Sequence, residues 1–185
     1  MKRIALFLAM ILCLAPILGA CGANSSPEKV ATAAFEAMFI DCDYEAYFET
    51  NYTLDLDLLE EVMGDSDKYE SMKDAARTSR DSIKESIKSI KDRYEDSDEI
   101  KDYDIEYDVR YVMSYEKDTD IFDELIDEFA FADTDFEDLV EEIAVVGIAA
   151  EFYSTDKDGN ETVSGDYAEI ICYNIDGDWY IDSVY

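Results

Sequence analysis

The sequence contains no histidine among its 185 residues. A catalytic Ser-His-Asp or Cys-His arrangement needs an imidazole as its base, and the HExxH zinc motif needs two. The absence of histidine therefore excludes these three kinds of site, together with ordinary imidazole acid–base chemistry.

Basic residues are few: 15 lysines and arginines face 47 aspartates and glutamates, so the net charge is −32. A nucleic-acid-binding protein needs Lys and Arg concentrated on an exposed surface, and we therefore expect no nucleic-acid partner. Apolar residues still make up 48% of the chain and include 14 Tyr and 9 Phe. This is enough apolar material to bury a core, which argues against wholesale disorder.

The long apolar run at the N-terminus is too short for a spanning helix. It covers residues 4–18, fifteen residues with one proline among them, whereas a transmembrane helix needs about 18 or more. Lys2 and Arg3 precede it, and the small pair Gly19-Ala20 follows it. These are the three parts of a secretory signal peptide, so we expect residues 1–20 to be removed on export.

The end of this segment, Leu18-Gly19-Ala20-Cys21, resembles the lipobox of bacterial lipoproteins, in which a leucine, a small residue, glycine or alanine, and a cysteine follow one another. The resemblance implies a diacylglyceryl thioether on Cys21 and cleavage before it. Cys21 is then the lipid attachment site, and the protein is anchored to the outer face of the cell membrane. Residues 21–26 form the lipidated cysteine and its tether, which reaches at most about 18 Å.

Cleavage leaves 165 residues, the length of one domain, which we expect over residues 27–185. Because two basic residues leave with the signal, 13 basic residues then face 47 acidic ones, and the net charge becomes −34. Of the four cysteines, Cys13 leaves with the signal and Cys21 carries lipid. Cys42 and Cys172 remain, without a CxxC pair; a disulfide between them is permitted after export, and buried free thiols are the alternative that we favour.

The first half of the domain has the spacing of helices. Ser26 is placed to cap a helix with Pro27 in its first turn, a second short helix is expected over residues 44–49, and residues 55–63 predict another turn or two. The longest helical pattern covers residues 66–95, where apolar or small side chains recur every three or four positions.

Six basic residues follow this apolar stripe one position later, so they line a flank about 100° round the same helix. They are Lys73, Arg77, Arg80, Lys84, Lys88 and Lys91. This basic flank is a candidate contact surface for anionic lipid headgroups or wall polymers, at about 1 kcal/mol for each charge near the surface. The alternative is that these residues pair with the surplus of acids around them, as individually weak ion pairs.

Residues 103–115 alternate between apolar and polar side chains, which predicts a strand with one buried face. That face carries Tyr103, Tyr107, Tyr111 and Tyr115. Tyrosines offer a ring and a hydroxyl, so such a face can line a pocket for a flat or amphipathic ligand. The alternative is that these rings pack beneath the helices.

The last part of the domain predicts a helix over residues 120–131 and a meander of three strands, residues 144–154, 162–175 and 178–185. Asp-Gly turns separate these strands, so neighbours are antiparallel. The turn at residues 156–160 is the nearest approach to a calcium-binding EF-hand loop, but its twelfth position is glycine where glutamate is required. We therefore predict no metal site and no cofactor, and weak divalent-cation binding from charge alone stays an alternative.

The two ends of the domain resemble those of small exported domains in the nuclear transport factor two-like and cystatin-like superfamily. Pro27-Glu28-Lys29-Val30 leading to Phe35, then Asp43-Tyr44, is similar to their opening helix pair, and residues 176–184 are similar to their closing hairpin and strand. The resemblance implies an α+β fold, in which N-terminal helices pack on the concave face of a curved antiparallel sheet of about four strands. In that fold the helix of residues 66–95 is inserted before the first strand.

Domains of this superfamily often enclose a cone-shaped cavity, and Phe35, Tyr107, Tyr111 and Trp179 are its candidate pocket-lining residues here. Some members are isomerases, cyclases or dehydratases, but no catalytic motif carries over to this chain, so no catalytic residue is assigned. We expect a non-enzymatic, extracytoplasmic lipoprotein that binds a small apolar ligand or another envelope protein. The alternatives are a small-molecule enzyme of the same fold and a surface protein that binds divalent cations weakly.

Overall fold

A computed structural model describes residues 24–57, 60, 67–94, 99–126 and 139–184. The expected signal peptide and Cys21 lie outside the described residues, as do residues 58–59, 61–63 and 127–131 of two expected helices. Within the described ranges, no helix has the length and apolar character needed to cross a membrane.

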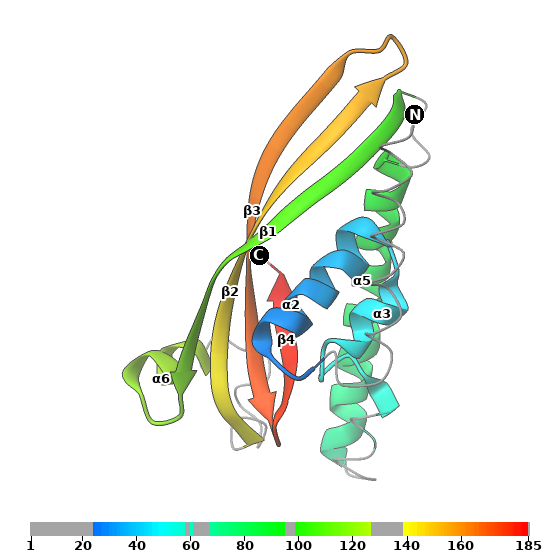
Figure 1. The fold of residues 1–185 in the computed structure, drawn as a ribbon. Coiled ribbons are helices and arrows are strands. Elements are labelled where there is room, and N and C mark those ends of the chain that lie inside the picture. The colour runs from blue at the N-terminus through cyan, green and yellow to red at the C-terminus, as the bar shows by residue number, and fades with distance from the viewer. Residues whose placement is uncertain (1–23, 58–59, 61–66, 95–98, 127–138, 185) are drawn as a thin grey trace.

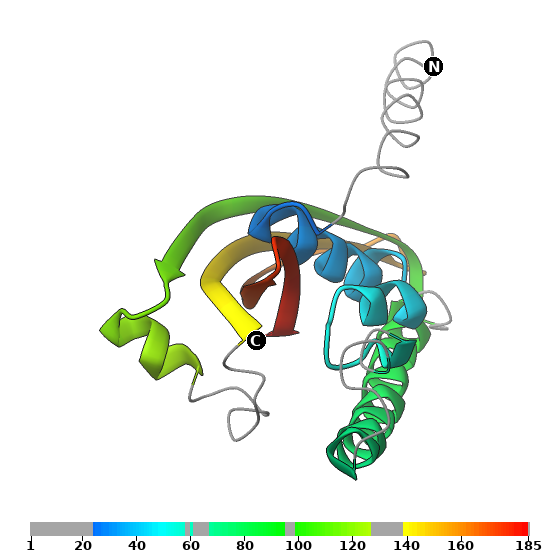
Figure 2. The same ribbon diagram turned by 90° about the horizontal axis from the view of Figure 1, so that it is seen from below.

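Helices come first in the described chain and a meander of strands follows. The elements are α2 (Pro27–Phe35), η1 (Glu36–Ile40), α3 (Tyr44–Glu49), α5 (Asp67–Tyr94), β1 (Ile100–Glu116), α6 (Asp120–Ile126), β2 (Val140–Asp156), β3 (Glu161–Ile175) and β4 (Asp178–Val184). The strands form one antiparallel sheet in the order β1-β2-β3-β4, with α2, α3 and α5 on one side of it (Figure 1). Figure 2 shows the curvature of the sheet, with α2 lying inside the bend. The predicted α+β fold, with a long helix before the first strand, is confirmed.

The N-terminal helices begin where the sequence predicts. The Ser26 hydroxyl caps α2 by accepting the backbone N–H of Lys29 at 3.3 Å, and the Asp43 carboxylate caps α3 by accepting two backbone N–H groups. Between these helices, η1 is a turn of π-helix. A π-helical turn widens the helix locally, so it changes the direction in which the side chains around it point.

The main core lies between the inner face of the sheet and the helices α2, α3 and α5. Its buried side chains include Val30, Ala34, Phe35, Phe48, Ile87, Val146, Ile148, Ala150, Ile170, Cys172, Trp179 and Ile181. Each large apolar side chain that is removed from water contributes about 1.5–3 kcal/mol to folding. These side chains fill the inner face where the helices cover it, whereas the inward residues of β3 before Ala168 are exposed.

The two cysteines of the described domain are not bonded to each other. Cys172 is buried in the main core and Cys42 is half-buried, and neither forms a disulfide. Burial raises the pKa of the Cys172 thiol, so this group stays protonated and unreactive at neutral pH.

A second buried cluster covers the opposite, outer face of the sheet, but only at the end near the β3–β4 turn. It joins α6, which lies on the other side of the sheet from α2 (Figure 1), to the outward side chains Ile143 and Tyr173. At the edge strand β4 the cluster continues through Tyr180 and Tyr52 to Met72 and Ala76 of α5. Because both faces of β3 are covered here, residues 170–175 are all buried, whereas residues 161–167 are all exposed.

Strand β1 contains an extra residue that its sequence alternation does not reveal. Val109 pairs with Ile148 but Tyr111 pairs with Gly147, so Arg110 is a β-bulge. The bulge reverses the alternation, because side chains in a strand point to opposite faces with a period of two. Odd-numbered residues before Arg110 point to the inner face and those after it point outward, so the prediction of one continuous tyrosine face is wrong beyond Arg110.

Candidate functional site

The four candidate pocket-lining residues do not share a cavity. Phe35 and Trp179 are buried in the main core, and Tyr107 is half-buried on the inner face with its ring centroid 5.1 Å from that of Phe35. Tyr111 stands on the outer face. The structure therefore brings Phe35 and Tyr107 together and separates Tyr111 from them.

Tyr107 contacts Glu36, an acid that the sequence pattern does not indicate as a site residue. Its hydroxyl donates to Oε1 of Glu36 at 2.5 Å, and the π-helical turn η1 places Glu36 there. Burial, together with the hydrogen bond to Glu36, raises the pKa of Tyr107 above its ordinary value. This hydrogen bond joins η1 to the sheet, and the rings of Phe35 and Phe39, whose centroids are 5.0 Å apart, lie beside it in a tilted arrangement.

The outer face of the sheet between the β2–β3 hairpin and Gly147 carries carboxylates and tyrosines; we call it the outer acidic face. The register of the strands places twelve residues on it. They are Asp104, Glu106, Asp108 and Tyr111 of β1, Gly147, Ala149, Glu151 and Tyr153 of β2, and Val163, Gly165, Tyr167 and Glu169 of β3. No single segment of the sequence shows this grouping, because it depends on the pairing of three strands.

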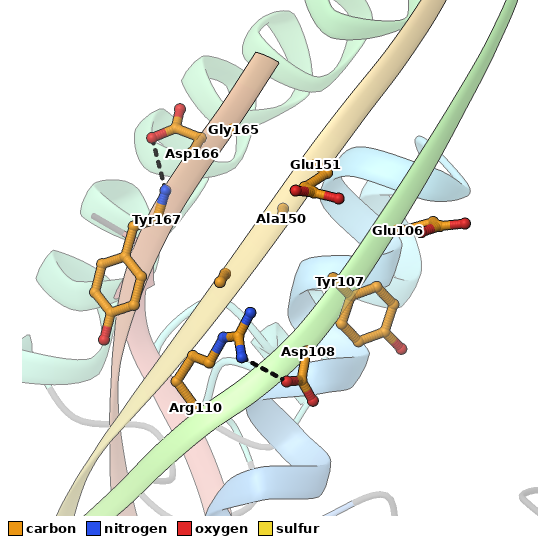
Figure 3. A pocket seen from close by; sticks show the side chains of 10 residues that line it. Glu106, Tyr107, Asp108, Arg110, Ala150, Glu151, Gly165, Asp166 and Tyr167 are labelled. Carbon is orange, nitrogen blue, oxygen red and sulfur yellow. Dashed lines mark hydrogen bonds and ion pairs between the residues drawn. The ribbon is translucent and has the colours of Figure 1, made fainter. Parts of the chain in front are cut away.

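A shallow hollow of about 580 Å³ lies on this part of the sheet. Figure 3 shows the ten residues that line it: Glu106, Tyr107, Asp108, Arg110, Ala149, Ala150, Glu151, Gly165, Asp166 and Tyr167. Small residues of β2 and β3 leave room at its centre, and longer side chains from all three strands surround them. Arg110 is the only base among these ten residues, and its guanidinium pairs with Asp108 at 3.1 Å.

Gly147 makes room for a tyrosine cluster beside the hollow. The Tyr111 hydroxyl donates to Oε1 of Glu169, and the ring centroids of Tyr111 and Tyr167 are 6.3 Å apart. A Cβ atom at position 147 would lie 2.6 Å from the Tyr111 ring and 2.1 Å from the Tyr167 hydroxyl oxygen. The hydrogen bond to Glu169 raises the pKa of Tyr111, so the tyrosine stays a donor and holds the carboxylate in place.

A second tyrosine–carboxylate pair lies on the same face. The Tyr153 hydroxyl donates to Oε2 of Glu151 at 2.5 Å, and this hydrogen bond raises the pKa of Tyr153 to about 12. Tyr153 therefore keeps its proton at neutral pH, while Glu151 accepts its hydrogen bond at the rim of the hollow. The outer acidic face thus presents carboxylates that are oriented by neighbouring tyrosines.

The basic flank of α5 is not one uniform surface, because Arg80 turns toward α3. One of its amino groups donates to the carbonyl oxygen of Leu54 at 2.7 Å, and the other pairs with Glu45 at 3.2 Å. Its guanidinium carbon also lies 4.1 Å from the centroid of the Phe48 ring. Arg80 is therefore part of the packing between α3 and α5.

The other members of the basic flank have different surroundings. The Lys84 ammonium lies 4.1 Å from the centroid of the Tyr44 ring. Lys73 and Arg77 pair with the acids three residues before them, Glu70 at 3.8 Å and Asp74 at 3.5 Å, and Lys88 and Lys91 are exposed. Contact of this flank with anionic lipid stays a prediction.

Across the described part of the chain, no three acidic or thiol side chains are grouped so that they could hold a metal ion. No family model, no curated protein and no solved structure matches the chain. The resemblances to the lipobox and to the nuclear transport factor two-like and cystatin-like superfamily therefore stay predictions from the sequence.

Proposed function

We propose that this protein is a lipid-anchored, extracytoplasmic binding domain whose outer acidic face holds a basic segment of another envelope protein. The observation that carries the proposal is the hollow on that face. It brings exposed carboxylates of β1 and β2 together with an exposed tyrosine of β3, around small residues, in a chain with a large surplus of acids.

The shape and chemistry of the hollow suit lysine or arginine side chains. Their apolar stems can lie over Ala149 and Gly165, while their charged ends reach Glu106 and Glu151 at the rim. The ring of Tyr167, which is 45% exposed, offers a flat surface for a cation. Tyrosine is enriched at protein interfaces for this reason, since it combines apolar area with a hydrogen-bonding group.

The inner face of the sheet gives less support to two alternative functions, binding of a small apolar ligand and catalysis. A small apolar ligand needs an enclosed space there, and buried side chains from α2, α5 and the sheet fill the part of that face that the helices cover. The enzyme alternative needs an acid–base pair, for example a tyrosine and a carboxylate, that is open to substrate. Tyr107 and Glu36 are a tyrosine and a carboxylate in contact, but they bond each other beside Phe35 and Phe39, so we prefer a binding function.

The predicted lipid anchor is compatible with a hollow that faces away from the membrane. The backbone N–H of Trp179 donates to the carbonyl oxygen of Asn24 at 2.8 Å, so the described chain starts at the end of the sheet near the β3–β4 turn. Cys21 precedes Asn24 by three residues and would hold the lipid within about 10 Å of it. Gly165 lies nine residues from Asn174, the partner of Trp179, which is about 30 Å along β3. This distance exceeds the Debye length of about 10 Å, so an orientation with β3 directed away from an anionic membrane keeps the hollow outside the range of the membrane charge.

Binding of a fluorescent lysine-rich peptide to the full-length protein in a non-ionic detergent tests the proposal. The double variant Glu106→Gln/Glu151→Gln should weaken binding by about three- to tenfold, because each exposed charge pair is worth only about 0.2–1 kcal/mol. The matched control Asp81→Asn/Glu85→Gln removes the same charge from the exposed surface of α5 and should leave the affinity unchanged. Equal weakening by both double variants would show unspecific attraction and contradict the proposal.

A further inference from the structure

The outer acidic face ends at an open strand edge. β4 pairs with β3 only from Ile170 to Ile175, so residues 161–169 of β3 pair with β2 on one side and with no described strand on the other. In Figure 1 the hairpin of β2 and β3 rises beyond α2 and β4. Such an edge presents a row of backbone N–H and C=O groups that another chain can bond.

The adjoining edge of the sheet, along β4, is covered by the protein itself. The backbone N–H of Trp179 donates to Asn24, and the backbone N–H of Ile181 donates to the carbonyl oxygen of Thr50, both at 2.8 Å. Through these two bonds, the protein's own loops cover the edge of β4 that does not pair with β3. Cover of this kind is one of the ways in which folded proteins prevent edge pairing.

The third edge, along β1, is interrupted by two register shifts, one after Ile100 and one at the Arg110 bulge. Residues 161–169 differ from β1, because their register with β2 runs without a shift. They contain no proline and no lysine, and their charged residues, Glu161, Asp166 and Glu169, are all acidic, so they repel an acidic strand and attract a basic one. Among the described edges, this stretch has none of the protections that the other two show.

An apolar hollow of about 190 Å³ adjoins the open edge on the inner side of the sheet. Its lining residues are Phe35, Met38, Phe39, Ala150, Phe152, Asp166, Tyr167 and Ala168. Three of them belong to the edge itself, so a chain that pairs with the edge passes directly beside the hollow. Successive side chains of such a chain point to opposite faces, one into the hollow and the next over the outer acidic face.

We propose that the basic segment binds as an added strand along residues 161–169, with apolar side chains toward the inner hollow and lysines or arginines over the outer acidic face. This inference rests on the proposed function and specifies its binding mode. Charge complementarity favours such a partner over a second copy of this chain. Two copies paired at this edge would bring Glu161, Asp166 and Glu169 against the same acids in molecules of large negative charge.

The test uses synthetic peptides of alternating lysine and leucine, long enough to cover residues 161–169, and the full-length protein in non-ionic detergent. One peptide is unmodified, one is N-methylated at its lysine amides and one at its leucine amides. Neighbouring N–H groups of a strand point to opposite sides, so only one methylated peptide loses its bonds to the edge. That peptide should bind about tenfold or more weakly, and the other should bind like the parent.

Amide hydrogen exchange supplies the second readout. With the unmodified peptide bound, alternate amides among residues 161–169 should exchange more slowly than in the protein alone. Equal affinity of all three peptides, with no amide slowed, would overturn strand addition. The proposed function would stand if the double variant Glu106→Gln/Glu151→Gln still weakened peptide binding in that case. Slow exchange of these amides without peptide, together with a dimer mass in sedimentation, would assign the edge to a second copy and overturn the inference.

Discussion

Tyr107 and Tyr111, four residues apart in β1, point to opposite faces of the sheet. Tyr107 donates to Glu36 on the inner face, and Tyr111 donates to Glu169 on the outer face. The bulge at Arg110 separates them, because one extra residue reverses the side-chain alternation. One inserted residue therefore divides the tyrosines of β1 between the inner and the outer face of the sheet.

The contact of Tyr111 with Gly147 predicts that a methyl group at position 147 is costly. Gly147→Ala should lower the free energy of unfolding by about 0.5–1.5 kcal/mol, because the new Cβ displaces the ring ends of Tyr111 and Tyr167 and breaks the hydrogen bond from Tyr111 to Glu169. Gly165→Ala is the matched control on the same face, since its Cβ would meet only the carbonyl oxygen of Ala150, at 3.9 Å. Urea unfolding of both variants measures the difference, and equal stability would contradict this account of the tyrosine cluster.

Arg80 should matter for stability more than its neighbours on the basic flank. Arg80→Ala removes the hydrogen bond to Leu54, the pair with Glu45 and the contact with the Phe48 ring, so we expect a loss of about 1–3 kcal/mol. Lys88→Ala, at an exposed position of the same helix, should change stability by less than about 0.5 kcal/mol. Similar losses in the two variants, measured by urea unfolding, would argue against a packing role for Arg80.

Stability should fall at alkaline pH because of buried tyrosines. Burial raises the pKa of Tyr52 to about 12, and it also raises the pKa values of Tyr47 and Tyr107. Above the ordinary pKa of 10.0, unfolded tyrosines lose protons that the folded protein keeps. The unfolded state then binds fewer protons, so the free energy of unfolding decreases as the pH rises from 10 toward 12.

Urea unfolding at a series of alkaline pH values, followed together with tyrosinate absorbance, checks this prediction. The contribution of these tyrosines is fully present below pH 10 and is lost above it. The variant Tyr47→Phe should show a shallower decrease than the unaltered protein, because one of the raised groups is gone. A free energy of unfolding that stays constant across this range would show that these hydroxyls titrate normally.

Membrane anchoring depends on Cys21 if the lipobox interpretation is right. Cys21→Ala should abolish labelling by radioactive fatty acid and release the protein from the membrane fraction, because no thiol remains for the diacylglyceryl group. Cys13→Ala, in the apolar part of the same segment, is the matched control and should leave both measurements unchanged. Retention and labelling of the Cys21→Ala protein would contradict the predicted anchor.

Much of the element order follows from short-range chemistry. Ser26 caps the helix that it was expected to cap, α3 covers the predicted residues 44–49, and the apolar repeat over residues 66–95 became the helix α5. Gly159 and Gly177 adopt positive φ values of 85° and 90° in the predicted turns, a conformation that glycine allows without steric cost. These features could be predicted because each depends on a few neighbouring residues.

The candidate site could be predicted only in part. Tyr107 and Tyr111 were recognised as unusual, but their separation depends on the bulge at Arg110, and the partner of Tyr107 depends on the π-helical turn that places Glu36. Neither irregularity has a local signal in the sequence. Each exists because strand pairing and core packing on both sides favour it over the regular alternative.

Composition and short motifs were sufficient to indicate an acidic α+β domain without imidazole chemistry, because they concern the kinds of residue present and the spacing along one segment; export and lipidation stay predictions from the same motifs. The outer acidic face and the open edge of residues 161–169 were not visible in this way. They arise where three strands align and where β4 ends beside Ile170, so they depend on contacts between residues far apart in the chain. The energy of those contacts comes from burial of the whole core, which no single segment determines.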